Sequence, residues 1–179
     1  WTTVAGETAS TYDIPSGLTV TRQYRRITIS TLNTVACESV PTATVQITVQ
    51  TVPTAGTIGG TQTICNGGDP AAFTSTTDGS GDGAITYRWE SSVSPFSTWT
   101  TVAGQTAATY DAPSGLTVTT QYRRITISTL NAVACESVPT ATVQITVQSV
   151  PTAGTIATSQ TICNGGDPTA FTNTGSGTG

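Results

Sequence analysis

A long internal repeat is the feature that most constrains how this chain folds. Residues 1–81 align with residues 99–179 without a gap, and 67 of the 81 positions are identical. The shift between the two copies is 98 residues, which is too long for one coil of a solenoid and is typical of one β-sandwich domain. The sequence therefore predicts a tandem array of similar modules.

Two proline-containing junctions set the boundaries of these modules. Pro53 and Pro151 each follow a run that alternates like a strand, and a proline at that point interrupts a β-ladder. With these boundaries, residues 52–149 form one complete module. Residues 1–51 are the C-terminal part of a preceding module, and residues 150–179 are the N-terminal part of a following one. Neither partial piece contains a counterpart of residues 82–98, so we interpret the chain as a segment of a longer array.

The composition predicts an all-β protein and excludes several kinds of catalytic and metal chemistry. Its apolar residues are mainly Val, Ile and Ala, set among 42 threonines, and no helical period occurs. Because Lys and His are absent, the chain has no His-based catalytic triad, no His-ligated metal and no Schiff-base lysine. Six basic residues against ten acidic ones disfavour a nucleic-acid partner. No apolar run is long enough for membrane insertion.

Alternating patterns place the strands of the complete module. In Thr142–Gln148, strict alternation puts Val143, Ile145 and Val147 on one face and polar residues on the other. In the same way Ile85, Tyr87 and Trp89 share a face. We therefore expect Trp89 to anchor a hydrophobic core.

One predicted strand, Gln121–Ser128, does not place its apolar residues on one face. Strict alternation puts Tyr122 and Arg124 on one side, and Ile125 and Ile127 on the other. A bulge at the arginine pair would bring Tyr122 and the isoleucines to the same side. We therefore expect a bulge there.

The four cysteines are two copies of two sites, and none of their spacings matches a zinc knuckle or a redox motif. A structural disulfide is our first interpretation. Within the complete module the available pair is Cys65 with Cys135; pairing Cys37 with Cys65 would instead link neighbouring modules, and loop entropy does not distinguish the two. The length of the final strand favours Cys65–Cys135. Buried free thiols are the alternative.

The motifs of the complete module follow a characteristic order. Tyr87-x-Trp89 comes first, then Trp99-Thr-Thr-Val-Ala-Gly104, then Tyr122-Arg-Arg124, and then Cys135 and a terminal Val-x-Ile-x-Val strand. This order resembles the immunoglobulin-like, PKD-like repeats of very large Bacteroidota surface proteins, among them the gliding-motility adhesins. One difference from antibody domains is that Cys135 lies thirteen residues after Tyr122 instead of two. The disulfide is therefore not expected to be the usual bridge between the sheets.

This resemblance implies a fold, a location and a role. It implies immunoglobulin-like β-sandwich modules that are exported to the cell surface by the type IX secretion route. The expected role is a structural repeat, a stalk or filament segment, in an extracellular adhesin. The expected partners are neighbouring repeats, laterally associated copies, and a surface polysaccharide or receptor.

Three acidic or hydroxyl side chains form a candidate calcium site. Asp78, Ser80 and Asp82 alternate with glycines, a spacing that can wrap calcium. The twelfth position of this motif is Trp89 instead of the glutamate of an EF-hand, and Ser176 replaces Asp78 in the other copy. A flexible Gly/Asp turn without any cofactor is therefore the preferred interpretation.

Trp99 is the candidate ligand contact. Aromatic faces beside polar groups suit carbohydrate, which gives the alternative function of a multivalent carbohydrate-binding repeat. The Arg123–Arg124 pair could mark an anion-binding patch, but in an acidic chain we expect these arginines to pair with Glu90, Glu136 or Asp111. Paired carboxylates such as Asp78 and Asp82 lie in a glycine turn, so no enzyme activity is expected.

Overall fold

A computed structural model describes residues 1–157 and 159–179, and these residues form strands and turns without a helix. The chain is therefore all-β, which confirms the prediction from composition. No helix capable of crossing a membrane is found in the described parts of the chain. The fold divides into two compact units, Trp1–Thr51 and Val52–Gly179.

The first unit holds two small antiparallel sheets. In one sheet β1 pairs with β4, and in the other β2 pairs with β3. The strands of this unit are β1 (Arg22–Tyr24), β2 (Ile29–Leu32), β3 (Val35–Glu38) and β4 (Val45–Ile47). All of these strands are short, and most of their residues are exposed.

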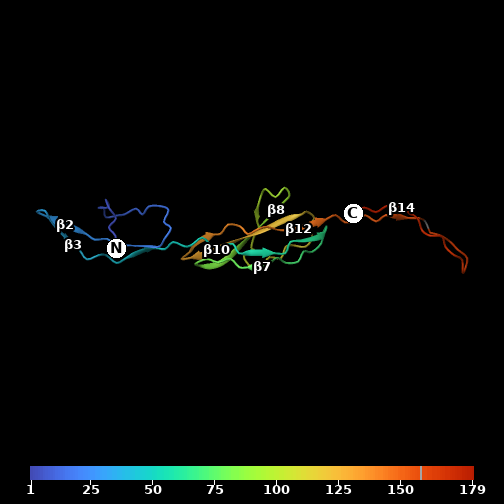
Figure 1. The fold of residues 1–179 in the computed structure, drawn as a ribbon, viewed down its shortest axis with the longest axis horizontal. Helices are drawn as coiled ribbons and strands as arrows, with labels where there is room; N and C mark the ends of the chain where they lie inside the picture. The colour runs from blue at the N-terminus through green and yellow to red at the C-terminus, as the bar shows by residue number, and fades with distance from the viewer. Residues whose placement is uncertain (158) are drawn as a thin grey trace. The chain divides into compact units, whose positions relative to one another are not determined.

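The second unit is built on a six-stranded sheet with the order β6-β12-β10-β8-β9, in which β11 also pairs with β10. Its strands are β5 (Thr57–Gly59), β6 (Gln62–Cys65), β7 (Thr74–Thr77), β8 (Ala84–Val93), β9 (Thr100–Thr101), β10 (Thr120–Leu130), β11 (Val133–Glu136), β12 (Val143–Gln148), β13 (Thr155–Ile156) and β14 (Asn173–Gly175). Two-stranded sheets are formed by β5 with β7 and by β13 with β14. Figure 1 shows β7, β8, β10 and β12 close together within the second unit.

The long antiparallel pair β8–β10 determines which residues face the core. Its register runs unbroken from Thr120 opposite Val93 to Thr129 opposite Ala84. Arg124 lies opposite Trp89, and Thr126 lies opposite Tyr87, so these four side chains share one face, called here the inner face. Trp89 is fully buried there, which confirms it as a core anchor.

An aromatic cluster forms the core on the inner face. The ring of Phe73, which lies just before β7, stacks on Trp89 with centroids 5.9 Å apart and contacts Tyr122 at 5.1 Å. Tyr110 packs against the same three rings. Phe73 and the β5–β7 pair thus form a second layer over the sheet, whereas β6, which lies between β5 and β7 in sequence, belongs to the sheet itself.

The alternation predicted for the last strand is confirmed in β12. Val143 and Ile145 are buried in the core, whereas Gln144 is partly exposed on the opposite face. The predicted bulge at the arginine pair is wrong, because β10 keeps strict alternation over this stretch. Arg124 instead points into the protein beside Tyr122, and Ile125 is buried on the opposite face.

Candidate functional site

Four charged side chains form an ion-pair cluster on the outer face of the sheet: Arg88, Glu90, Arg123 and Glu136. Glu90 accepts from Arg88 Nε at 3.2 Å and from Arg123 Nε at 2.7 Å. Arg88 also makes a bidentate pair with Glu136, in which the Nη2–Oε2 distance is 2.9 Å. Glu90 is buried and Glu136 is half-exposed. The pairing expected for the Arg123–Arg124 pair is thereby confirmed for Arg123 with Glu90, whereas the partner of Glu136 is Arg88.

The pKa values in this cluster follow from its hydrogen bonds. The bond from Arg88 holds the pKa of the Glu136 carboxyl below its ordinary value, and the same bond raises the pKa of Arg88. Arg88 and Glu136 are therefore both charged at neutral pH, and their opposite charges neutralise each other. The cluster leaves little free charge for a substrate.

Trp99 lies beside this cluster. The guanidinium of Arg123 stacks over the Trp99 ring, 4.1 Å from its centroid, which is a cation–π contact. Trp99 is half-buried. Since Arg123 covers one face of the ring, a sugar could stack only on the other face.

A fully buried arginine lies on the inner face. Arg124 Nη1 donates to Ala108 O at 2.7 Å and to Ser75 Oγ at 2.8 Å, and Nη2 donates to Thr77 O at 3.1 Å. Its guanidinium also stacks over the Tyr87 ring at 4.4 Å. Burial lowers the pKa of Arg124. This side chain joins the sheet to the second layer of the module.

Sequence reasoning missed the role of Arg124, because it expected both arginines of the pair to bind acidic side chains. A signal was present in the sequence: Arg124 has the same parity as Tyr122 along the strand, whereas Arg123 has the opposite parity. The expected partner Asp111 has no part in the hydrogen bonds of Arg124 described above. Carbonyl oxygens and Ser75 take that place.

The calcium candidates are directed to protein partners. The Asp78 carboxylate accepts from Ser75 Oγ at 2.5 Å, and Ser80 Oγ shares a hydrogen bond with Thr54 Oγ1 at 2.8 Å. Within the described residues no group of three or more His, Cys, Asp or Glu side chains could hold a metal ion. Two of the three candidate calcium ligands, Asp78 and Ser80, are thus hydrogen-bonded within the protein.

The glycines of this segment serve close packing instead. A Cβ added at Gly79 would lie 2.0 Å from Thr126 Oγ1, and one at Gly81 would lie 2.5 Å from Ser128 Cβ. The backbone of residues 79–83 thus lies directly on β10, with a glycine at every second position. Calcium binding is not needed to explain this pattern, because no larger residue fits there.

The cysteine pairing predicted within the module is wrong. Gln62 and Thr120 lie at the same level of the sheet, because both pair with the same residue of β12. Cys65 lies three residues beyond this level in one direction, and Cys135, paired with Ser128, lies eight residues away in the other. About eleven residues of strand, roughly 36 Å, separate them, against about 7 Å at most for a disulfide. All four cysteines are free thiols.

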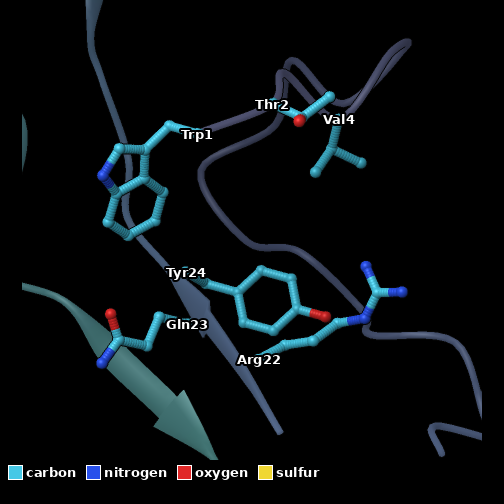
Figure 2. A pocket seen from close by; sticks show the side chains of 6 residues that line it. All are labelled: Trp1, Thr2, Val4, Arg22, Gln23 and Tyr24. Atoms are coloured by element: carbon cyan, nitrogen blue, oxygen red, sulfur yellow. The ribbon is translucent and has the colours of Figure 1, made fainter. Parts of the chain in front are cut away.

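The first unit contains a hollow between two segments of its chain (Figure 2). It is lined by Trp1, Thr2, Val4, Arg22, Gln23 and Tyr24. The guanidinium of Arg25 stacks over the Trp1 ring, 4.2 Å from the ring centroid. This contact repeats the Trp99–Arg123 contact of the complete module.

Comparison with known families places the chain. Residues 54–149 match the model of a domain of unknown function, DUF8696. The chain belongs to this family. The match covers the six-stranded sheet, the aromatic core, Arg124 and the ion-pair cluster, so these features are those of a DUF8696 domain. No curated protein and no solved structure gives a significant match.

Proposed function

We propose that this chain is a segment of an extracellular bacterial adhesin or surface fibre, built from tandem immunoglobulin-like β-sandwich modules that serve as structural repeats. In this proposal residues 52–149, which contain the DUF8696 match at residues 54–149, are one complete module. Residues 1–51 and 150–179 belong to its neighbours, as the 98-residue sequence repeat suggests. The similarity to gliding-motility adhesins further suggests a cell-surface location and type IX secretion.

The observation that carries the proposal is the position of the two ends of the module. At its N-terminal end, Ala55 O accepts from Thr126 Oγ1 at 3.1 Å. At its C-terminal end, β12 leaves at Gln148, three residues beyond the level of Thr120. About nine residues of strand, or roughly 30 Å, lie between these levels. A chain that enters and leaves at opposite ends of each module is suited to an extended row.

The chemistry of the module supports a structural role. The ion-pair cluster neutralises itself, and Arg124 is used inside the fold. These contacts stabilise the module and offer no nucleophile or general base with a shifted pKa. We therefore propose a structural protein and not an enzyme.

Electron microscopy tests the extended row. Proteins with two, four and six consecutive modules should appear as rods, because each module adds about 35 Å, the length of an eleven-residue strand such as β10. Compact, closed particles whose longest dimension does not grow with module number would contradict the proposal.

The second candidate function is carbohydrate binding at Trp99. The observation in its favour is that the stacked Trp99–Arg123 pair shares the outer face with Gln121, whose amide bonds to Gln144 at 3.0 Å. An aromatic ring, a guanidinium and amides suit sugar hydroxyls.

Binding of the full chain to a glycan panel distinguishes the two functions. Loss of binding in Trp99→Ala, but not in Trp1→Ala, would assign a lectin site to the complete module. Absence of binding by the folded protein would leave the structural role alone.

A further inference from the structure

The first and last strands of the six-stranded sheet lie side by side and run in the same direction. β6 pairs with β12 in parallel, in a register that begins with Gln62 opposite Ile145 and ends with Cys65 opposite Gln148. The backbone pairing continues one residue further, because Asn66 N donates to Gln148 O at 2.8 Å. The N-terminal and C-terminal parts of the module are therefore joined directly, by what is called here the β6–β12 ladder.

This ladder lies along the line between the entry and the exit of the chain. The chain enters at Ala55, whose carbonyl oxygen bonds to Thr126. It then runs through β5 and β6 toward the opposite end, where Gln62 is level with Thr120. β12 runs the same way and leaves at Gln148. Tension on the chain therefore pulls β6 toward the entry and β12 toward the exit, in opposite directions along the strand axis.

Tension in this direction acts on the ladder in shear. When two paired strands slide past each other along their axes, all the hydrogen bonds between them are strained at the same time. When the strands are instead pulled apart sideways from one end, the bonds break one after another. The same few backbone bonds therefore resist a larger force in the first geometry, because no single bond carries the whole force.

The entry segment before β6 is held by further hydrogen bonds. Thr54 N donates to Ser80 O at 2.8 Å, and the hydroxyl groups of Thr54 and Ser80 share a bond of 2.8 Å. The Ala55 carbonyl oxygen accepts from Thr126 Oγ1 at 3.1 Å and from Arg124 Nη2 at 3.4 Å. These contacts tie the first residues of the module to its body, so tension at the entry acts on them together with the ladder.

We propose that the β6–β12 ladder makes the complete module a mechanical element that keeps its fold while the chain is under tension. This function goes beyond the proposed structural role, because modules can form an extended row whether or not each module resists stretching. Electron microscopy tests the row, and force measurements test the ladder. All the strands involved belong to residues 52–149, so the function depends on contacts within one module.

Stretching the full chain between its two ends in a force spectrometer measures this resistance. Unfolding of the complete module should appear as one event with a defined peak force. The event should lengthen the chain by about 300 Å, because 98 residues extend to about 3.5 Å each and the folded module spans about 35 Å. The peak force is governed by the unfolding rate and not by the free energy of unfolding. The direction of the pull is therefore the variable to change.

A second direction of pull on the same fold is the matched control. Cys65 is exposed and lies opposite Gln148 at the exit. A chain with Cys37→Ser, Cys135→Ser and Cys163→Ser keeps this single thiol for attachment of a handle. Tension between Cys65 and the C-terminus peels β6 from β12 one pair at a time, so most of the peak force measured end to end on this chain should be lost. Equal peak forces in the two directions would overturn the proposal.

A proline at position 66 tests the ladder by removing one of its bonds. Gly68 N donates to Cys65 O at 2.9 Å, and the φ of Gly67 is +79°. This is the geometry of a type II turn, in which proline is favoured at the second residue. Asn66→Pro is therefore compatible with the turn and removes the N–H that donates to Gln148 O.

Asn164→Pro is the matched control for this variant. Asn164 lies in the same kind of turn, in which Gly166 N donates to Cys163 O at 2.9 Å, but it lies outside the complete module. The end-to-end peak force of the module should fall in Asn66→Pro and stay unchanged in Asn164→Pro. The same peak force in both variants would contradict the role of the ladder.

Discussion

At the scale of single residues, Arg124 and Arg123 show how neighbouring identical side chains acquire different roles. Arg124 is fully buried and donates to backbone oxygens, whereas Arg123 lies on the outer face with Glu90 and Trp99. An interior guanidinium is retained only where hydrogen bonds satisfy it. Ser75 and Thr77 of the second layer supply two of these acceptors, and Ala108 O supplies a third.

The first prediction concerns the stability contributed by Arg124. Arg124→Met should lower the free energy of unfolding by about 2–4 kcal/mol, because it leaves buried carbonyl oxygens without donors. Arg123→Met is the comparison variant and should cost less than Arg124→Met, because Glu90 keeps its hydrogen bond from Arg88 and the Arg123 side chain is 25% exposed. Urea unfolding of the full chain followed by tryptophan fluorescence measures both. Equal losses would contradict the assigned role.

The second prediction concerns alkaline pH. Burial raises the pKa of Tyr122 from its ordinary value near 10 to about 12. The folded state therefore favours the protonated phenol, which adds about 2–3 kcal/mol to the free energy of unfolding. This contribution is complete below pH 10 and is lost as the pH rises through 12. Tyr122→Phe should remove most of this loss. Chemical unfolding at pH 7 and pH 11.5 tests it, and equal pH dependence in both proteins would refute it.

At the scale of elements, the segment 79–83 and strand β10 depend on each other. Gly79 and Gly81 bring the backbone of one onto the small side chains of Thr126 and Ser128 in the other. The Ser128 hydroxyl accepts from Gly83 N at 2.9 Å. Small residues on one element thus permit close approach of the other.

The third prediction is a coupling between these elements. Gly81→Ala should cost about 1–3 kcal/mol, because its Cβ would lie 2.5 Å from Ser128 Cβ. The same change made in a Ser128→Gly background should cost at least about 1 kcal/mol less, since the clashing atom is gone. Ser128→Ala keeps that atom and removes only the Oγ, which lies 2.6 Å from the added Cβ, so it should give less relief than Ser128→Gly. A double-mutant cycle by urea unfolding measures the coupling.

The strands themselves could be predicted from sequence better than their contacts. Alternation correctly placed Val143, Ile145 and Trp89 in the core, because a half-buried strand has a side-chain period of two. The expected bulge at the arginine pair was wrong. It assumed that isoleucines face the core and arginines face water, whereas Arg124 is buried and Ile125 is buried on the other face.

At the scale of the whole molecule, the two cysteines of the complete module mark its opposite ends. Cys135 lies at the N-terminal end with Ser128, and Cys65 lies at the C-terminal end with Gln148. Their separation excludes a bond within the module. The stability of the module therefore comes from its aromatic core, β-ladders and buried hydrogen bonds.

The fourth prediction follows from this separation. Reductant should not change the unfolding midpoint of the full chain, and Cys65→Ser combined with Cys135→Ser should change stability by less than about 1 kcal/mol. The measurement is urea unfolding with and without reductant, together with a thiol count under denaturing conditions. A Cys65–Cys135 linked peptide in mass spectrometry would contradict the register of this sheet.

The sequence by itself determined the 98-residue repeat, the all-β class and the buried position of Trp89. These features depend on local alternation and on identity between copies, which are visible along one chain. Only the tertiary structure decided the burial of Arg124, the reason for the glycines of residues 79–83 and the separation of Cys65 from Cys135. Each of these depends on strand register and on contacts between residues that are distant in sequence, and the periodicity of a single strand carries no information about its partners.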